Sequence, residues 1–306
     1  MTESTILVGV DDSAEAANAL DWAAAYAGRT GAALHVVSSY ALPGFFLPFD
    51  EDGKRIVPDD LRVRTAVERT LAHAAARAER AGATVTTEVA TGDPTGVLVE
   101  RSGDHALAVV GSRGHGGFAE RLLGTVSATL PAYSRCPTVV VPFRQESEPL
   151  VPDDDASTDE VRRYGRVVVG VDGSSGSDTA MRFAATVARA LDAELLVVHA
   201  VPADRWGQLP WTPSRPDRDT VLSSATDELA SAVEALRADA PDVTVTPRVV
   251  DGGAGPALAQ LSETADVVVV GCRGRGGFQG LLLGSTSQSA LRGAHCPVLV
   301  VRGAEA

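Results

Sequence analysis

The segment VGVDDS at residues 8–13 returns almost unchanged as VGVDGS at residues 169–174. Residues 6–11 form a short apolar run rich in β-branched side chains, which is typical of a buried strand, and the Asp-Asp-Ser that follows is typical of a helix start. Further matches continue at offsets of 160 or 161 residues: GSRGHGGF at 111–118 with GCRGRGGF at 271–278, and CPTVVV at 136–141 with CPVLVV at 296–301. The chain is therefore interpreted as two tandem copies of one domain.

The length agrees with this interpretation, because 306 residues is about twice the usual size of one domain. We expect a first domain over 1–143, a linker over 144–163 and a second domain over 164–306. The linker is predicted from its acidic, Pro- and Ser-containing composition, which is typical of a solvated segment.

Charge and hydropathy narrow the class of protein. Lys and Arg number 27 against 40 Asp and Glu, for a formal net charge of −13, so we expect neither a nucleic-acid partner nor a membrane-surface partner. The sequence shows no secretory pattern at its start and no apolar stretch near the roughly 18 residues of a membrane helix. Its three cysteines lack CxxC spacing, which favours reduced thiols over disulfides or zinc and indicates a cytoplasmic protein.

Strands and helices are expected to alternate along both copies. Strands are predicted at 6–11, 33–39, 84–89, 106–110 and 138–141, and again at 167–172, 195–200, 243–249, 267–270 and 298–301. Helices are predicted at 13–29, 61–81, 95–101 and 126–133, and again at 179–191, 220–237, 256–264 and 286–293. This order predicts an α/β fold in which each copy is a doubly wound, five-stranded parallel sheet with helices on both faces.

Ligands of such sheets bind beyond the carboxyl ends of the strands, and there the sequence places glycines and aspartates. The first strands end at Gly9 to Asp11 and at Gly170 to Asp172, and the fourth strands run into GSRG at 111–114 and GCRG at 271–274. Such loops and the helix starts after them suit a phosphate, and the two aspartates suit a ribose hydroxyl or an adenine edge. The alternative, that these glycines only form tight turns, is less favoured because the spacing occurs twice.

These motifs resemble the universal stress protein family. The pattern Gly-x-x-Gly, nine residues, Gly-Ser/Thr is met by Gly111, Gly114, Gly124 and Thr125, and by Gly271, Gly274, Gly284 and Ser285. The resemblance covers both halves and implies a tandem protein with strand order 3-2-1-4-5 in each domain, a fold of the adenine nucleotide alpha hydrolase type. It also implies one ATP site per domain, with Mg²⁺ as an optional companion, and pairing of the two domains as a pseudo-dimer; a homodimer of the whole chain is also open.

The resemblance implies a set of binding residues in each copy. The first set is Gly9, Asp11, Ser39, Gly111, Arg113, Gly114, Gly116, Gly117, Gly124, Thr125, Val126 and Ser127. The second set is Gly170, Asp172, Ala200, Gly271, Arg273, Gly274, Gly276, Gly277, Gly284, Ser285, Thr286 and Ser287. For the two arginines, pairing with phosphate and a solvated loop position both remain open. The copies differ at Ser38 against His199 and at Ser112 against Cys272, which leaves equal affinity of the two sites in doubt.

Other chemistries lack their residues. A P-loop needs a lysine after a glycine-rich run, and the only lysine, Lys54, lies in the acidic stretch DEDGKR at 50–55. The histidines show no metal-ligand spacing and are interpreted as surface or strand-end residues. The favoured function is an ATP-binding regulatory protein of the stress response. The alternatives are a slow ATPase or phosphotransferase at the same sites, and a structural pseudo-dimer without ligand.

Overall fold

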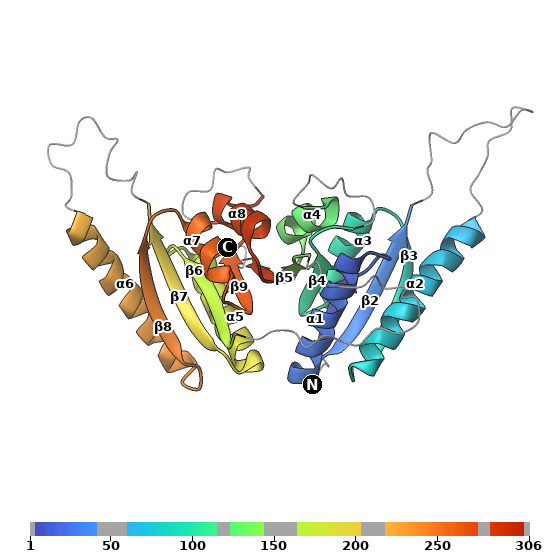
Figure 1. The fold of residues 1–306 in the computed structure, drawn as a ribbon, viewed down its shortest axis with the longest axis horizontal. Coiled ribbons are helices and arrows are strands. Elements are labelled where there is room, and N and C mark those ends of the chain that lie inside the picture. The colour runs from blue at the N-terminus through green and yellow to red at the C-terminus, as the bar shows by residue number, and fades with distance from the viewer. Residues whose placement is uncertain are drawn as a thin grey trace, which may run out of the picture. The chain divides into compact units, whose positions relative to one another are not determined.

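The computed structural model describes residues 4–41, 60–114, 123–143, 164–202, 218–274 and 282–302. The chain divides into two compact units, Met1–Thr158 and Asp159–Ala306. Each unit is a single sheet with helices on both faces (Figure 1). Among the helices of the described ranges, none combines the length and the apolar character that a membrane span requires.

The sheet of the first unit has the predicted strand order. Its strands are β1 (Thr5–Gly9), β2 (Ala33–Tyr40), β3 (Val85–Thr91), β4 (Leu107–Gly111) and β5 (Thr138–Val141). They lie in the order β3-β2-β1-β4-β5, and the pairings among them are parallel. Because β1 and β4 are neighbours and the chain turns to opposite sides after them, their carboxyl ends border the crevice where the strand order reverses.

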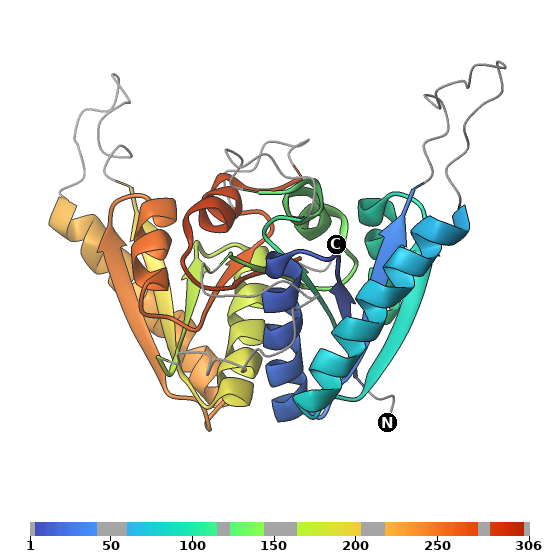
Figure 2. The ribbon, with the colours of Figure 1, turned by 45° about the vertical axis from the view of Figure 1, so that its right-hand side comes forward.

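Two helices cover each face of this sheet. Helices α1 (Ala14–Thr30) and α2 (Asp60–Arg80) contact each other, as do α3 (Pro94–Arg101) and α4 (Thr125–Tyr133). Figure 2 shows α1 and α2 on the same side of the sheet. A short 3-10 turn, η1 (Ser102–Asp104), follows α3. The two layers bury the inner strands, and Leu7 and Val8 of β1 are fully inaccessible, while the edge strand β3 stays partly exposed.

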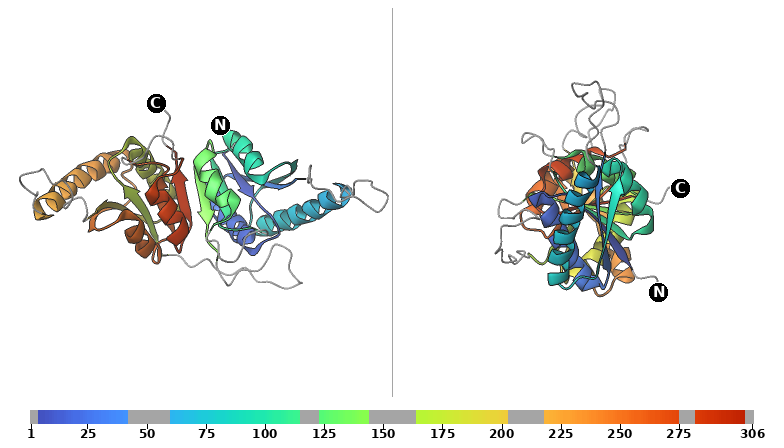
Figure 3. Two further views of the ribbon diagram at one scale, coloured as in Figure 1. Left: turned by 90° about the horizontal axis from the view of Figure 1, so that it is seen from above. Right: turned by 90° about the vertical axis from the view of Figure 1, so that its right-hand side faces the viewer.

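The second unit repeats this plan, and Figure 3 shows the layers from above. Its strands are β6 (Arg166–Val171), β7 (Glu194–Val201), β8 (Val245–Asp251), β9 (Val267–Gly271) and β10 (Val298–Val301), in the order β8-β7-β6-β9-β10. Its helices are α5 (Ser175–Leu191), α6 (Arg218–Asp239), α7 (Ala254–Ser262) and α8 (Ser285–Gly293). The expected pairing between the two copies stays a prediction.

The start of α5 differs from the sequence-based expectation. The helix begins at Ser175, four residues before the predicted start at Thr179. The segment Ser-Ser-Gly-Ser is a poor helix former, which is why the prediction began late. In the structure Ser174 is the N-cap, and its hydroxyl accepts a hydrogen bond from Ser177 N at 3.2 Å. One capping bond therefore outweighs the low propensity of the first turn.

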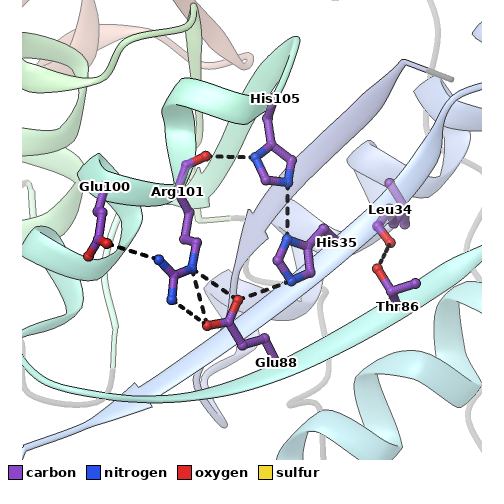
Figure 4. Close-up of polar contacts among 7 residues, drawn as sticks. All are labelled: Leu34, His35, Thr86, Glu88, Glu100, Arg101 and His105. Atoms are coloured by element: carbon purple, nitrogen blue, oxygen red, sulfur yellow. Dashed lines mark hydrogen bonds and ion pairs between the residues drawn. The ribbon is translucent and has the colours of Figure 1, made fainter. Parts of the chain in front are cut away.

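A cluster of polar side chains is peculiar to the first unit (Figure 4). His35 Nδ1 and His105 Nε2 are 3.0 Å apart, and the rings are stacked. On its other side His35 faces Glu88 at 3.3 Å, and Glu88 accepts hydrogen bonds from Arg101. Burial, and then the neighbouring His105, lower the pKa of His35 below its ordinary value. The interpretation of the histidines as surface or strand-end residues did not include this pairing.

The cluster predicts that acid weakens the first unit more than the second. Neutral His35 contributes stability that is complete above the unfolded pKa of about 6.5 and is lost as the pH falls through the lower folded-state value. In the second unit Leu196 stands at the position of His35. His35 pairs with the third residue of β1, and Leu196 pairs with the third residue of β6.

Hydrogen exchange at pH 7 and pH 5, corrected for intrinsic rates, measures this difference. We expect protection in β2 to fall about threefold more than in β7, and His35→Leu to remove most of the excess. Equal losses in β2 and β7, or an unchanged loss in His35→Leu, would contradict the assignment.

Candidate functional site

The carboxylate at the end of the first strand is held in the same way in both units. Asp11 Oδ1 accepts hydrogen bonds from the backbone N–H of Ser13 at 3.1 Å and from the Ser13 hydroxyl. Asp172 Oδ1 accepts from the backbone N–H and the hydroxyl of Ser174, at 3.1 and 2.6 Å. Each serine also caps the helix that follows. The cap therefore fixes the start of the helix and the direction of the carboxylate together.

Glycine at the loop after the fourth strand allows the two strand ends to meet. A Cβ at Gly114 would overlap the Asp11 carboxylate at Oδ2, and a Cβ at Gly274 would overlap Oδ2 of Asp172. Any side chain at these positions would displace the carboxylate or the loop. The structure thus brings together Asp11 with Gly114, and Asp172 with Gly274, as the sequence-based site required.

The next helix starts are pinned to the ends of the same strands. In the first unit the carbonyl of Ser112 accepts from Gly124 N at 2.8 Å and from Ser127 Oγ at 2.6 Å. In the second unit the carbonyl of Cys272 accepts from Gly284 N at 2.8 Å and from Ser287 Oγ at 3.2 Å. Glycine is the N-cap of both α4 and α8, and neither cap supplies a side-chain hydrogen bond. The first N–H groups of both helices are therefore uncapped and suited to an anion.

The hydroxyl-bearing residues predicted at the starts of α4 and α8 differ in burial. Ser127 and Ser287 are almost fully buried and donate their hydroxyls to backbone carbonyls of the loop. Thr125 and Ser285, the first residues of α4 and α8, are exposed. The exposed hydroxyls are thus at the surface of the site, while the buried ones hold the loop.

A cavity of about 950 Å³ opens at this place in the second unit. Every residue of the second predicted set that lies in the described ranges lines it: Gly170, Asp172, Ala200, Gly271, Arg273, Gly274, Gly284, Ser285, Thr286 and Ser287. The remaining two, Gly276 and Gly277, lie outside the described residues, as do Gly116 and Gly117 of the first set. Small-molecule sites usually measure about 300–1,000 Å³, so the cavity is large enough for a nucleotide.

Several further residues line this cavity that the sequence-based set did not contain. His199, near the end of β7, donates a hydrogen bond from Nδ1 to the Val171 carbonyl at 2.9 Å. Ser224 and Glu228 enter from α6, one turn apart, and Ser289 enters from α8. Spacing of four residues on a helix signals a shared face, but only the fold shows that this face of α6 meets the end of β7.

The first set occupies the equivalent positions of the first unit. Gly9 lies against Leu98 of α3, and Ser39 lies near the end of β2 beside Ala90. Val126, the second residue of α4, is half-buried. Arg113 is half-buried, with a buried Nε that has no hydrogen-bond partner among the described residues. Its guanidinium lies 5.7 Å from the centre of the Phe143 ring, and its Nε lies 4.0 Å from Glu15 Oε1.

The cysteine in the second loop is a structural thiol. Cys272 Sγ donates to the Leu282 carbonyl at 3.1 Å. Burial raises the pKa of this thiol, while Arg302 and Arg273 act in the opposite direction. The described residues contain no group of three or more His, Cys, Asp or Glu side chains arranged to hold a metal ion. The chemistry of the site therefore rests on hydroxyls, backbone N–H groups, the aspartate and arginine.

Comparisons with known proteins agree with this architecture. The universal stress protein family matches residues 4–142 and again residues 163–302. The universal stress protein Rv2623 of Mycobacterium tuberculosis is 33% identical over 97% of this chain and 96% of its own length. A second protein of that organism, Rv2005c, is also 33% identical over the same shares. A crystal structure of a universal stress protein from Archaeoglobus fulgidus shares the fold, with a TM-score of 0.66 and 22% identity over 98% of this chain and 96% of that one.

The hydrogen bonds that hold the loop before α8 predict that Ser287 and Ser285 contribute differently to the stability of the protein. Ser287→Ala removes the hydroxyl that bonds the Cys272 and Gly284 carbonyls, and we expect a loss of about 1–2 kcal/mol in the free energy of unfolding. Ser285→Ala removes an exposed hydroxyl and should change that free energy by less than about 0.5 kcal/mol. Urea denaturation followed by circular dichroism measures both. Equal effects of the two variants would show that the Ser287 hydroxyl does not hold the loop.

Proposed function

Because the chain belongs to the universal stress protein family and carries two copies of its domain, we propose that it binds ATP, with one site in each unit. In this proposal nucleotide occupancy is the signal, and the protein passes it on as a regulatory component of a stress response. The single observation that carries the proposal is the cavity of the second unit, into which Asp172, the glycine loop and the start of α8 all open.

The lining of this cavity offers different chemistry to the two parts of a nucleotide. Asp172 Oδ1 accepts hydrogen bonds from Ser174, and its other oxygen lies towards Gly274 inside the cavity. A carboxylate only accepts hydrogen bonds, so it suits the hydroxyl donors of a ribose. Near it the N–H groups at the start of α8, the exposed hydroxyl of Ser285 and the guanidinium of Arg273 suit phosphate oxygens.

The lining beside β7 suits a nucleobase. Ala200 and Val201 supply apolar surface, and His199 supplies a ring with two nitrogens. An aromatic or apolar wall with a few polar groups is the usual setting of a bound base. The oxygen donors of Ser285 and Thr286 also fit Mg²⁺, which prefers oxygen ligands and would bring charge neutralisation to the phosphates.

Binding explains this site better than turnover. Phosphoryl transfer needs a group that positions the attacking nucleophile, in addition to groups that hold the phosphates. Asp172 holds Ser174 through Oδ1, and in this proposal its other oxygen accepts from the ribose. The three cysteines are buried thiols outside any disulfide, which fits a reducing compartment, and we expect the protein to act in the cytoplasm.

Calorimetric titration with ATP tests the proposal on the full chain. We expect binding by the unaltered protein and at least a tenfold loss of affinity at the second site in Gly274→Ala, because the new Cβ displaces Asp172. Gly28→Ala is the matched control, since a Cβ there meets no atom within 4 Å, and its affinity should be unchanged.

Two results would overturn the proposal. Absence of binding to any adenine nucleotide, together with no nucleotide in the natively purified protein by mass spectrometry, would favour the purely structural alternative. Hydrolysis at ordinary enzyme rates of about 1 s⁻¹ or more, lost in Gly274→Ala, would favour the ATPase alternative.

A further inference from the structure

The loops that follow β4 and β9 have similar backbone contacts, but the charged side chains around them differ. Ser13 and Ser174 are the N-caps of α1 and α5, so the residues that flank them correspond one to one. The first unit has Asp12 before this serine and Glu15 two residues after it. The second unit has Gly173 and Gly176 at the same positions. Two carboxylates of the first site thus have glycine as their counterpart in the second.

The carboxylate of Glu15 lies at the first loop and is not a remote surface charge. A Cβ on Gly111 would lie 2.7 Å from the Glu15 carbonyl, so the loop packs directly on this residue. Glu15 is only 17% exposed, and its Oε1 lies 4.0 Å from Arg113 Nε. Arg113 is further covered by Phe143. The cation of the first loop therefore already has a carboxylate beside it before any ligand arrives.

In the second unit the equivalent cation faces the cavity without that carboxylate. Arg273 is exposed and lines the cavity, and Gly176 takes the place of Glu15 beside it, with its Cα close enough that a Cβ would lie 3.1 Å from the Arg273 carbonyl. Arg302 adds a second cation near this loop, because it follows Val301, whose carbonyl accepts a hydrogen bond from Cys272 N at 2.8 Å. Its counterpart in the first unit is Pro142, which follows β5 as Arg302 follows β10.

In the described parts of the two loops the arginines therefore have different surroundings. At the first loop the Glu15 carboxylate lies beside Arg113, and at the second loop Gly176 takes that place beside Arg273. Glu228 enters the cavity of the second unit from α6, which packs on β7 and β8. Asp178 of α5 is exposed and is not part of the cavity lining.

We propose that the two sites rank their ligands by phosphate charge: both bind adenine nucleotides, but the second site favours those with a polyphosphate chain and the first favours the monophosphate. This proposal rests on the proposed function, since both sites must bind adenine nucleotide. Each additional phosphate charge is attracted at the second loop and repelled at the first. At the separations of one loop such differences change affinity by about 10- to 100-fold per site.

The test compares ATP with AMP at one site at a time, by calorimetry without added divalent ions. Gly274→Ala weakens the second site, so that binding at the first site can be measured. Gly114→Ala weakens the first site, so that binding at the second can be measured. We expect the ratio of ATP affinity to AMP affinity to be at least tenfold higher at the second site, with the difference shrinking at high salt.

Variants that remove one charge then test which residues set the ratio of ATP affinity to AMP affinity. Glu15→Gln, in the Gly274→Ala background, should raise ATP affinity at the first site about 5- to 10-fold and leave AMP affinity within twofold. Arg273→Gln alone should lower ATP affinity and spare AMP affinity at the second site, a result that does not depend on either glycine variant folding. Asp178→Asn is the matched control and should change neither.

The outcomes separate the two proposals. If both sites bind with the same ATP-to-AMP ratio, or if Glu15→Gln and Arg273→Gln leave the ratio unchanged, selection by charge is wrong while nucleotide binding stands. If neither ATP nor AMP binds to the unaltered chain, nucleotide binding itself is wrong, and the selectivity falls with it.

Discussion

One backbone carbonyl in each unit carries the geometry of the site. The carbonyl of Ser112, at the end of β4, accepts both Gly124 N and Ser127 Oγ, and the carbonyl of Cys272 does the same for Gly284 and Ser287. These bonds join the residue that follows the strand to the start of the next helix, so that α4 begins beside the end of β4 and α8 begins beside the end of β9. The uncapped N–H groups of that helix then lie beside the aspartate of the first strand. Without this closure the aspartate and the helix start would have no fixed relation, and no site would exist.

The same interaction explains how two copies can share a site and differ in its charge. The contacts that hold the loop involve backbone atoms, glycine and a buried serine. These contacts therefore do not require particular side chains at the neighbouring positions. Cys272 replaces Ser112 without changing the bonds to the carbonyl. Glu15 and Gly176, or Pro142 and Arg302, likewise differ between the units, while the bonds to the two carbonyls are the same. The backbone sets the geometry of the loop, and the side chains around it set its charge.

Particular residues show where sequence-based reasoning succeeded and where it stopped. The strand order followed from the resemblance, while the parallel sheet and the two strand ends followed from buried valine runs and helical periodicity, because both patterns are local. The late predicted start of α5 shows the limit of propensity, since one hydrogen bond to Ser174 outweighs three poor helix formers. The buried surroundings of Ser127 and Ser287, and the pairing of His35 with His105, depend on residues far apart in the chain, and no local pattern reports them.

The sequence alone determined the duplication, the class of fold and the family, and it predicted the positions of the two sites, because repeats, periodicity and glycine spacing are local patterns along the chain. Only the tertiary structure decided that Asp172 touches Gly274, that Ser224 and Glu228 of α6 share its cavity, and that Glu15 lies against Arg113. The physical reason is distance. Electrostatic and steric effects act between atoms a few ångströms apart, and folding alone sets which distant residues come that close.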